Sequence, residues 1–343
     1  MKITDMTFRT VSVPFLASLV ENWPDDSYNF SFTPDYPMTM IWVHTDEGLT
    51  GVGESMALDH GRIEQMKQTY VGRRLWDVDL AAESPSMQCA LYDIAGQALD
   101  LPMHQLMGTK HRDRVELAYW SPPMTPKATL REAERAKELG FRVHKLKARP
   151  WTIVEIAQLA AKACGPDFQL RVDPNTQFGD VATAARLARE LLPYNIEVYE
   201  DPIRFHDVSW YRQLRAKCEP PVARHFGAPA DVFQFLKNDA IDALNTGGNE
   251  TTIRKNAALA EAAGMPIWTQ IFAFGSCVGT TYAAHLTCTI PNCTMPIDEL
   301  PHVKIDDLSE DGFELRDGAV TVPDRPGLGI TINMKAVEKY QTA

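Results

Sequence analysis

Between about residues 113 and 300 the chain alternates short runs of apolar, β-branched residues with longer stretches whose apolar residues recur at helical spacing. This alternation is typical of an α/β protein with a parallel sheet. Eight runs are expected to be strands, and eight parallel strands close a barrel. They are Val115–Tyr119, Val143–Ala148, Gln169–Asp173, Glu197–Glu200, Pro221–His225, Asp242–Thr246, Pro266–Gln270 and Thr294–Asp298.

The intervening stretches are predicted to be helices that pack on these strands, because their apolar residues fall on one face. Gly140, Gly165 and Gly264 follow three of them and are expected to end those helices. The clearest stretches are Thr129–Leu139, Ile153–Ala163, Ala182–Leu192 and Thr251–Ala263.

The two ends of the chain have a different pattern. Residues 1–112 start with an alternating strand and continue with a strand at Met38–His44 and helical sequence through Gln88–Leu99, as in an α+β unit. After about residue 300 come short strand-like pieces separated by an Asp-Gly turn. We therefore expect a capping domain over 1–112, whose sheet also receives the tail, a barrel over 113–300, and a C-terminal segment over 301–343 that returns to the cap.

Composition narrows the class of protein. The net charge of -11 comes without any Lys/Arg-rich run, which argues against nucleic acid or an anionic membrane as partner. The N-terminal stretch lacks the apolar core of a signal peptide, and no apolar run is long enough to span a bilayer. The six cysteines form no CxxC pair, so buried thiols are expected rather than disulfides or zinc ligands. We expect a soluble, cytoplasmic enzyme that acts on a small molecule.

Polar residues at strand ends indicate where the chemistry lies, because the carboxyl ends of barrel strands meet at one site. Lys145 and Lys147 alternate along one predicted strand and so face the barrel interior together. Neighbouring ammonium groups lower each other's pKa toward the range of a general base. The alternative is structural: one lysine forms an ion pair and the other reaches solvent at the rim.

Two carboxylates follow on the next two strands. Asp173 ends one strand and Glu200 ends the next. Asn175, two residues after Asp173, is expected to contact substrate. Mg²⁺ prefers such oxygen ligands and leaves positions open for substrate oxygens. Either acid alone could be a helix cap, but the repetition at successive strands favours a metal site.

The motifs around these residues resemble one family along nearly the whole chain: the enolase superfamily, in its mandelate racemase and muconate lactonizing enzyme group. The matching segments are DEGLTGVGES, SPSMQCALYDIAGQALDLPMHQLMG, HKLKAR, RVDPN, VYEDP and VPDRPGLGI. The resemblance implies an α+β cap over a modified (β/α)₇β barrel, and Mg²⁺-assisted removal of the proton α to a carboxylate to give an enediolate. It also implies Lys147 as the base, with Lys145 tuning it and steadying a carboxylate oxygen, and a symmetric homo-oligomer.

Three positions depart from the family pattern. The third metal ligand is expected at the end of the fifth strand, where this chain has His225, a better ligand for Mn²⁺ or another softer divalent ion than for Mg²⁺. The alternative is a structural histidine and an extra metal-bound water. Asn245 and Gln270 stand where relatives carry a second base, and are expected to contact substrate instead.

A base on one face only favours elimination over racemisation, which needs a base on each face. We therefore expect dehydration of a hydroxy acid or sugar acid. The Asp298-Glu299 pair at the eighth strand and His206 are candidate additional acids. Glu299 matches a family acid that hydrogen-bonds substrate oxygen, whereas for His206 a solvated loop residue is the alternative. The alternatives are an epimerase or cycloisomerase of the same family, and a degraded barrel with a binding or structural role.

Specificity is expected to come from the cap. Trp23, Tyr28 and Phe30 lie in a long loop after the first strand, and Met56–His60 forms a second loop. Loops of this kind exclude water and shape the substrate site. Packing between the two domains would account for the same aromatic residues.

Overall fold

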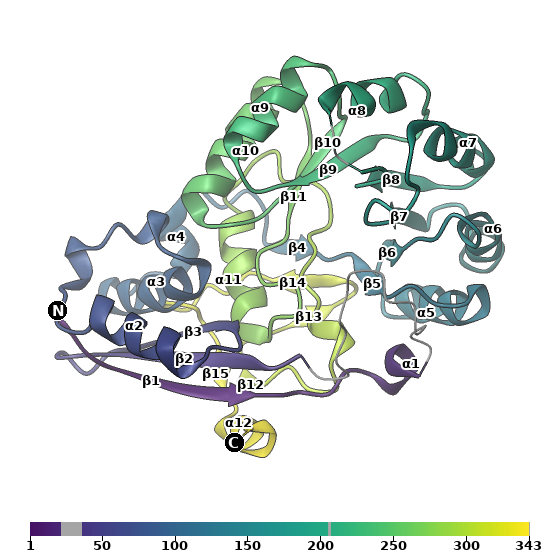
Figure 1. Ribbon diagram of the computed structural model, residues 1–343. Helices are drawn as coiled ribbons and strands as arrows, with labels where there is room; N and C mark the ends of the chain where they lie inside the picture. The colour runs from purple at the N-terminus through teal and green to yellow at the C-terminus, as the bar shows by residue number, and fades with distance from the viewer. Residues whose placement is uncertain (22–35, 205–206, 343) are drawn as a thin grey trace.

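The computed structural model describes residues 1–21, 36–204 and 207–342. Its largest element is a curled parallel sheet of seven strands, with helices on the outside (Figure 1). The strands lie in chain order, and each pairs in parallel with the next. They are β5 (Tyr119–Ser121), β6 (Val143–Lys147), β7 (Gln169–Asp173), β8 (Ile196–Glu200), β9 (Val222–Phe226), β10 (Ala243–Thr246) and β11 (Ile267–Thr269).

The segment after the last helix of the barrel joins the two edges of this sheet. Parallel bridges connect Cys293 to Ile267 on one side and Ile297 to Leu117 on the other. The predicted eighth strand is thus in place, but as single bridges rather than a regular strand. Pro296 lies in its middle, and a proline has no N–H to donate to a neighbouring strand.

Helices cover the outer face of the sheet between successive strands (Figure 1). Three of them end at Gly140, Gly165 and Gly264, which have φ values of 80°, 86° and 70°, so the predicted stops are confirmed. The helices are α5 (Pro126–Glu138), α6 (Ile153–Cys164), α7 (Val181–Leu191), α8 (Val208–Arg215), α9 (Pro229–Lys237), α10 (Glu250–Ala262) and the fully buried α11 (Cys277–Thr287).

The N-terminal region forms a separate antiparallel sheet with helices beside it (Figure 1). Helix α3 lies close against β3 because Gly51 and Gly53 have no side chain. A Cβ on Gly51 would stand 2.0 Å from the Ala90 carbonyl oxygen. The elements are β1 (Ile3–Val11), α1 (Ala17–Val20), β2 (Met38–Thr45), β3 (Thr50–Met56), α2 (His60–Tyr70), α3 (Pro85–Leu99) and α4 (Met103–Met107).

The tail contacts both parts of the molecule. Its strand β14 pairs with β4 (Arg114–Glu116), which corrects the predicted first barrel strand: only the end of Val115–Tyr119 joins the barrel sheet. Gln341 bridges Val11 at the end of β1. The tail elements are β12 (Ser309–Asp311), β13 (Leu315–Arg316), β14 (Ala319–Thr321), β15 (Thr331–Ile332) and α12 (Met334–Tyr340). Domain limits at 112 and 300 stay a prediction.

The described helices do not span a membrane, and the cysteines form no disulfides in the structure. In the described ranges, no helix is both long and apolar enough to cross a bilayer. All six cysteines are unpaired, and five of them are buried. They behave as small apolar side chains in the core.

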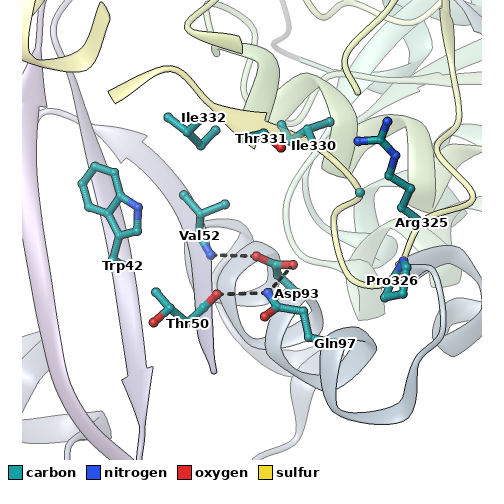
Figure 2. Close-up of a pocket in the computed structure, with 11 residues that line it drawn as sticks. Trp42, Thr50, Val52, Asp93, Gln97, Arg325, Pro326, Ile330, Thr331 and Ile332 are labelled. Atoms are coloured by element: carbon teal, nitrogen blue, oxygen red, sulfur yellow. Dashed lines mark hydrogen bonds between the residues drawn. The ribbon is translucent and has the colours of Figure 1, made fainter. Parts of the chain in front are cut away.

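A buried carboxylate joins the cap to the tail. Asp93 on α3 accepts hydrogen bonds from the backbone N–H groups of Val52 and Leu328 and from the Gln97 amide, at 2.8 to 2.9 Å. Figure 2 shows this group beside a cavity of about 480 Å³ that is also lined by Trp42 and Arg325. Burial raises the pKa of Asp93, and the three donors partly offset that effect.

Gly327→Ala should disrupt the contact between Asp93 and the tail. Its φ is +68°, and an added Cβ would stand 2.2 Å from Asp93 Oδ1 and 2.8 Å from the Asp93 carbonyl oxygen. We expect a loss of roughly 3 kcal/mol in the free energy of unfolding, measured with urea. Gly264→Ala is the matched control: its φ of +70° is close to that of Gly327, but nothing lies within 4 Å of an added Cβ, so about 1 kcal/mol is expected. Equal losses of unfolding free energy in the two variants would show that the contact between Gly327 and Asp93 does not contribute to stability.

Buried histidines should make stability depend on pH. His144 on β6 is fully buried, and burial lowers its pKa to about 3. The unfolded chain takes up a proton near pH 6.5 and the folded chain does not, so this contribution to stability is present above pH 6.5 and is lost as pH falls toward 3.

His144→Gln should therefore flatten the fall of unfolding free energy between pH 6 and 4, by up to about 1.4 kcal/mol per pH unit. Glutamine can still meet the Ser121 hydroxyl, which lies 2.8 Å from His144 Nε2. Urea unfolding at a series of pH values measures the slope. The exposed His60, changed to Gln, is the control. If His144→Gln leaves the slope of unfolding free energy against pH unchanged, His144 is not a source of the pH dependence.

Candidate active site

The two lysines of β6 both face the barrel interior, as their spacing predicts. Lys147 and Asp173 occupy the same position in the parallel pair β6–β7, at the carboxyl end of both strands. Lys147 Nζ lies 2.5 Å from Asp173 Oδ2. Lys145 is one layer deeper and only 2% exposed, whereas the Lys147 side chain retains 13% exposure. Lys147 is therefore the lysine that reaches the mouth of the barrel.

The Lys145 ammonium lies among three carboxylates from three different strand ends. The distances from Nζ are 2.6 Å to Asp298 Oδ2, 2.7 Å to Glu200 Oε2 and 3.3 Å to Asp173 Oδ2. Burial opposes the charge, but these carboxylates outweigh it and raise the pKa of Lys145. The side chain is a buried cation at neutral pH.

The two predicted metal-binding carboxylates differ in their electrostatics. Burial acts to raise the pKa of Asp173, but Lys147 and Lys145 bring it down to about 2. Burial raises the pKa of Glu200 to about 7, because Lys145 offsets only part of the cost. Asp173 is thus anionic, and Glu200 is a carboxyl that a further cation would convert to its charged form.

One element of the site was not anticipated from the sequence. Arg171 lies on β7 beneath Asp173, is completely buried, and donates to Asp298 Oδ1 at 2.9 Å and to Glu197 at the other end of the barrel. Its guanidinium stacks 4.3 Å from the Trp268 ring. The alternation of Arg171 with Asp173 along the strand was the pattern that could have predicted an inward side chain.

The opposite wall is uncharged. Asn245 lies one residue before the end of β10 and is fully buried. Its amide nitrogen lies 2.8 Å from Glu200 Oε1, 3.2 Å from Asp298 Oδ2 and 3.3 Å from Gln270 Oε1. Asn245 Oδ1 has no hydrogen-bond partner among the described residues. The structure therefore brings Asn245 and Gln270 to the carboxylates, and leaves one amide oxygen able to accept a bond from a ligand.

His225 lies one residue before the end of β9, so the strand continues one residue beyond the end expected from the sequence. Burial first, and Lys145 second, lower the pKa of His225 to about 4, so the imidazole is neutral at pH 7. Its Nε2 lies 3.3 Å from where a Cβ of Gly247 would stand, and a side chain there would also meet the Gln270 carbonyl oxygen at 2.6 Å. Glycine at 247 gives the ring its place beside β10.

The donor atoms fit a divalent cation in part. Asp173 and Glu200 already approach one shared cation, the Lys145 ammonium. Across the described ranges, however, no three His, Cys, Asp or Glu side chains are grouped closely enough to hold a metal. Mg²⁺ often binds through only one or two protein carboxylates, with water and substrate completing its shell. His225 as third ligand stays a prediction.

Glu299 lies beside the wall formed by the loop after β11. It is completely buried and accepts hydrogen bonds from the backbone N–H groups of Ile271, at 2.7 Å, and Phe272, at 3.2 Å. Burial raises the pKa of Glu299 well above its usual range, and those two donors do not offset it. Burial therefore favours the protonated form of this carboxyl.

Asn175 has a local structural role. Its backbone is left-handed, with φ of 46°, and its N–H donates to Asp173 Oδ1 at 3.0 Å. This bond fixes the orientation of the carboxylate. Contact of the Asn175 side chain with substrate stays a prediction.

The cap meets the barrel mouth through a second buried carboxylate that sequence reasoning missed. Glu54 on β3 accepts from the Ser276 backbone at 3.0 Å and from its hydroxyl, at the start of α11. A cavity of about 170 Å³ lies there, with Met56 and Phe272 in its lining. Trp23, Tyr28, Phe30 and His206, predicted to contribute to the site, lie outside the described residues.

Comparison with known proteins agrees with this architecture. The family described as Enolase C-terminal domain-like matches residues 128–336. D-xylonate dehydratase of Haloferax volcanii is 28% identical over 89% of this chain and 86% of its own length. N-succinylamino acid racemase of Thermus thermophilus is also 28% identical, over 74% of this chain and 69% of its own.

The fold is that of solved enzymes. The dipeptide epimerase of Enterococcus faecalis, in its complex with Mg and the dipeptide L-Leu-L-Tyr, superimposes with a TM-score of 0.82 at 21% identity, over 96% of this chain and all of that one. Further relatives are a D-gluconate dehydratase, a hydrophobic dipeptide epimerase and a muconate cycloisomerase. The chain belongs to the enolase superfamily, in its mandelate racemase and muconate lactonizing enzyme group.

Proposed function

We propose that this protein removes the proton α to the carboxylate of a small hydroxy acid or sugar acid and expels water from the neighbouring carbon. The observation that carries the proposal is the asymmetry of the barrel mouth. A lysine stands on one side, at the end of β6, and the uncharged pair Asn245 and Gln270 stands on the other. Relatives in the same family include enzymes named as dehydratases of D-xylonate and D-gluconate.

Lys147 is proposed as the base. It lies at the mouth, retains some exposure, and its ammonium is held by Asp173 Oδ2. A base must approach the reacting proton within hydrogen-bonding distance, and the carboxyl end of β6 is where the substrate site of such a barrel lies. Asp173 orients the Lys147 side chain.

Asp173 and Glu200 are proposed to hold a divalent metal ion, Mg²⁺ or, with the neutral His225 nearby, Mn²⁺ or another softer ion. The metal would stabilise the negative charge that develops on the substrate carboxylate. Both side chains are almost fully buried, so their charges act in a medium that screens little.

Glu299 is proposed to protonate the leaving hydroxyl. Burial raises the pKa of its carboxyl and so favours the protonated form, and the loop residues that bind it also line the cavity between cap and barrel. Asn245 Oδ1, which lacks a donor among the described residues, is proposed to accept a hydrogen bond from a substrate hydroxyl.

The second candidate is an isomerase, an epimerase or cycloisomerase, because several relatives carry such names. An epimerase would need a group on the Asn245 and Gln270 side to return a proton. A cycloisomerase needs one base only. The two candidates share proton abstraction and differ in whether water leaves.

Product analysis should separate them. Incubation with a library of hydroxy acids and sugar acids in deuterated buffer, with Mg²⁺ or Mn²⁺, is expected to give 2-keto acids by mass spectrometry. Exchange of the α proton without loss of water would instead establish the isomerase. Absence of both turnover and exchange, in protein that binds no metal, would exclude the enzyme proposal.

Lys147→Ala should lower kcat by about 10³-fold or more, because it removes the base and leaves the metal carboxylates in place. Steady-state kinetics with the best substrate measures the effect, and thermal unfolding checks that the barrel remains intact. Lys162→Ala, on the exposed surface of α6, is the control and should keep full activity. Full activity in the Lys147→Ala variant would show that Lys147 is not the base.

A further inference from the structure

Asp298 is the most heavily engaged side chain on the floor of the site. Its Oδ2 atom lies 2.6 Å from Lys145 Nζ, 2.8 Å from Trp268 Nε1 and 3.2 Å from Asn245 Nδ2. Its Oδ1 accepts from Arg171 at 2.9 Å. Four donors from four strands therefore hold one carboxylate that is only 2% exposed.

The donors fix Asp298 firmly from below. Arg171 is anchored at its far end by Glu197, at 2.7 and 3.1 Å, and is stacked on Trp268. Planar, bidentate pairs of this kind resist displacement more than a flexible lysine does. Asp298 is thus a fixed point to which the more mobile Lys145 ammonium is bound.

The position of the Lys145 ammonium follows from that attachment. An ammonium has three hydrogens, and Lys145 Nζ has three carboxylates around it. Its distance to Asp298, 2.6 Å, is shorter than its distance to Asp173, 3.3 Å. Only the contact with Asp298 Oδ2 is a hydrogen bond: Glu200 Oε2 lies 2.7 Å from Nζ but has no hydrogen-bond partner among the described residues. That oxygen is therefore left for another cation, and the role of Lys145 in steadying a substrate carboxylate stays a prediction.

We propose that Asp298 is a positioning residue: it draws the Lys145 ammonium to the barrel floor and so keeps Asp173 and Glu200 open to a divalent metal ion. This inference rests on the metal site of the proposed function. The ammonium already lies 3.3 Å from Asp173 Oδ2 and 2.7 Å from Glu200 Oε2. Without the hydrogen bond to Asp298 it would move closer to these two carboxylates and compete there with the metal.

The balance of charges also predicts that loss of Asp298 weakens metal binding. Arg171 and Glu197 neutralise each other, which leaves three carboxylates against the ammonium groups of Lys145 and Lys147. When a bound cation has converted Glu200 to its charged form, the three carboxylates exceed the two ammonium groups by one negative charge. Loss of Asp298 would remove that excess and also release Lys145, and the second effect depends on Lys145 being present.

A double-mutant cycle separates the two effects. Mn²⁺ is titrated calorimetrically into the metal-free wild type, Asp298→Asn, Lys145→Met and the double variant. Asp298→Asn is expected to weaken Mn²⁺ binding about 30-fold or more in the presence of Lys145, but only about 3-fold in the Lys145→Met background. Glu197→Gln, which removes an equal charge from the other end of Arg171, is the matched control and should change binding about 3-fold at most.

Equal losses in both backgrounds would overturn the positioning role and leave the metal site intact. A wild type that binds neither Mn²⁺ nor Mg²⁺ would overturn the proposed function and this inference together. Should Lys145→Met fail to fold, a crystal structure of Asp298→Asn decides. The Lys145 Nζ is expected to close on Asp173 from 3.3 Å to under about 3 Å, and an unmoved ammonium would refute the proposal.

Discussion

A buried ammonium among buried carboxylates is the interaction on which the rest of the site depends. Lys145 contacts carboxylates from three strand ends, and all four groups are almost completely shielded from water. Removing one partner from such a cluster typically costs about 3–5 kcal/mol, because the remaining charges stay buried without compensation. The fold can keep this cluster only while the strand register holds each group in place, so chemistry and architecture are constrained together.

The same requirement accounts for the fixed link between cap and barrel. Glu54 from the cap sheet binds the start of α11, and Gly275 and Gly279 leave room for it, since a Cβ at either would stand within 2.3 Å of Glu54 Oε1. Asp93 joins α3 to the tail on another side. Each link is a carboxylate from one part of the chain bound by backbone N–H groups of another. They place the cap over the mouth where Lys147 and Glu299 lie.

Much of this architecture follows from local pattern. Strand β7 begins and ends where the alternation predicts, and the glycine stops are those seen in the structure. The period-two rule also places Lys145 and Lys147 inside. Local pattern could not give the eighth strand its irregular form or assign β4 to the tail, because both depend on pairing between distant segments.

The site was harder to derive than the fold. Asp173, Glu200 and Lys147 could be located because each ends a strand, and their convergence needs only barrel geometry. The hydrogen bond between Lys145 and Asp298 joins residues 153 positions apart. Arg171 lies one layer below the strand end at Asp173. Tertiary packing decides which buried charged side chains contact one another, and the local pattern of one sequence does not predict those contacts.

A crystal structure with Mn²⁺ and a bound 2-hydroxy acid would test the central claim most directly. The account predicts metal density between Asp173 and Glu200, with Lys147 Nζ about 3–3.5 Å from the α carbon. It also predicts no titratable group on the opposite side of that carbon. Metal density elsewhere, or an α hydrogen that faces Asn245 and Gln270 instead of Lys147, would contradict it.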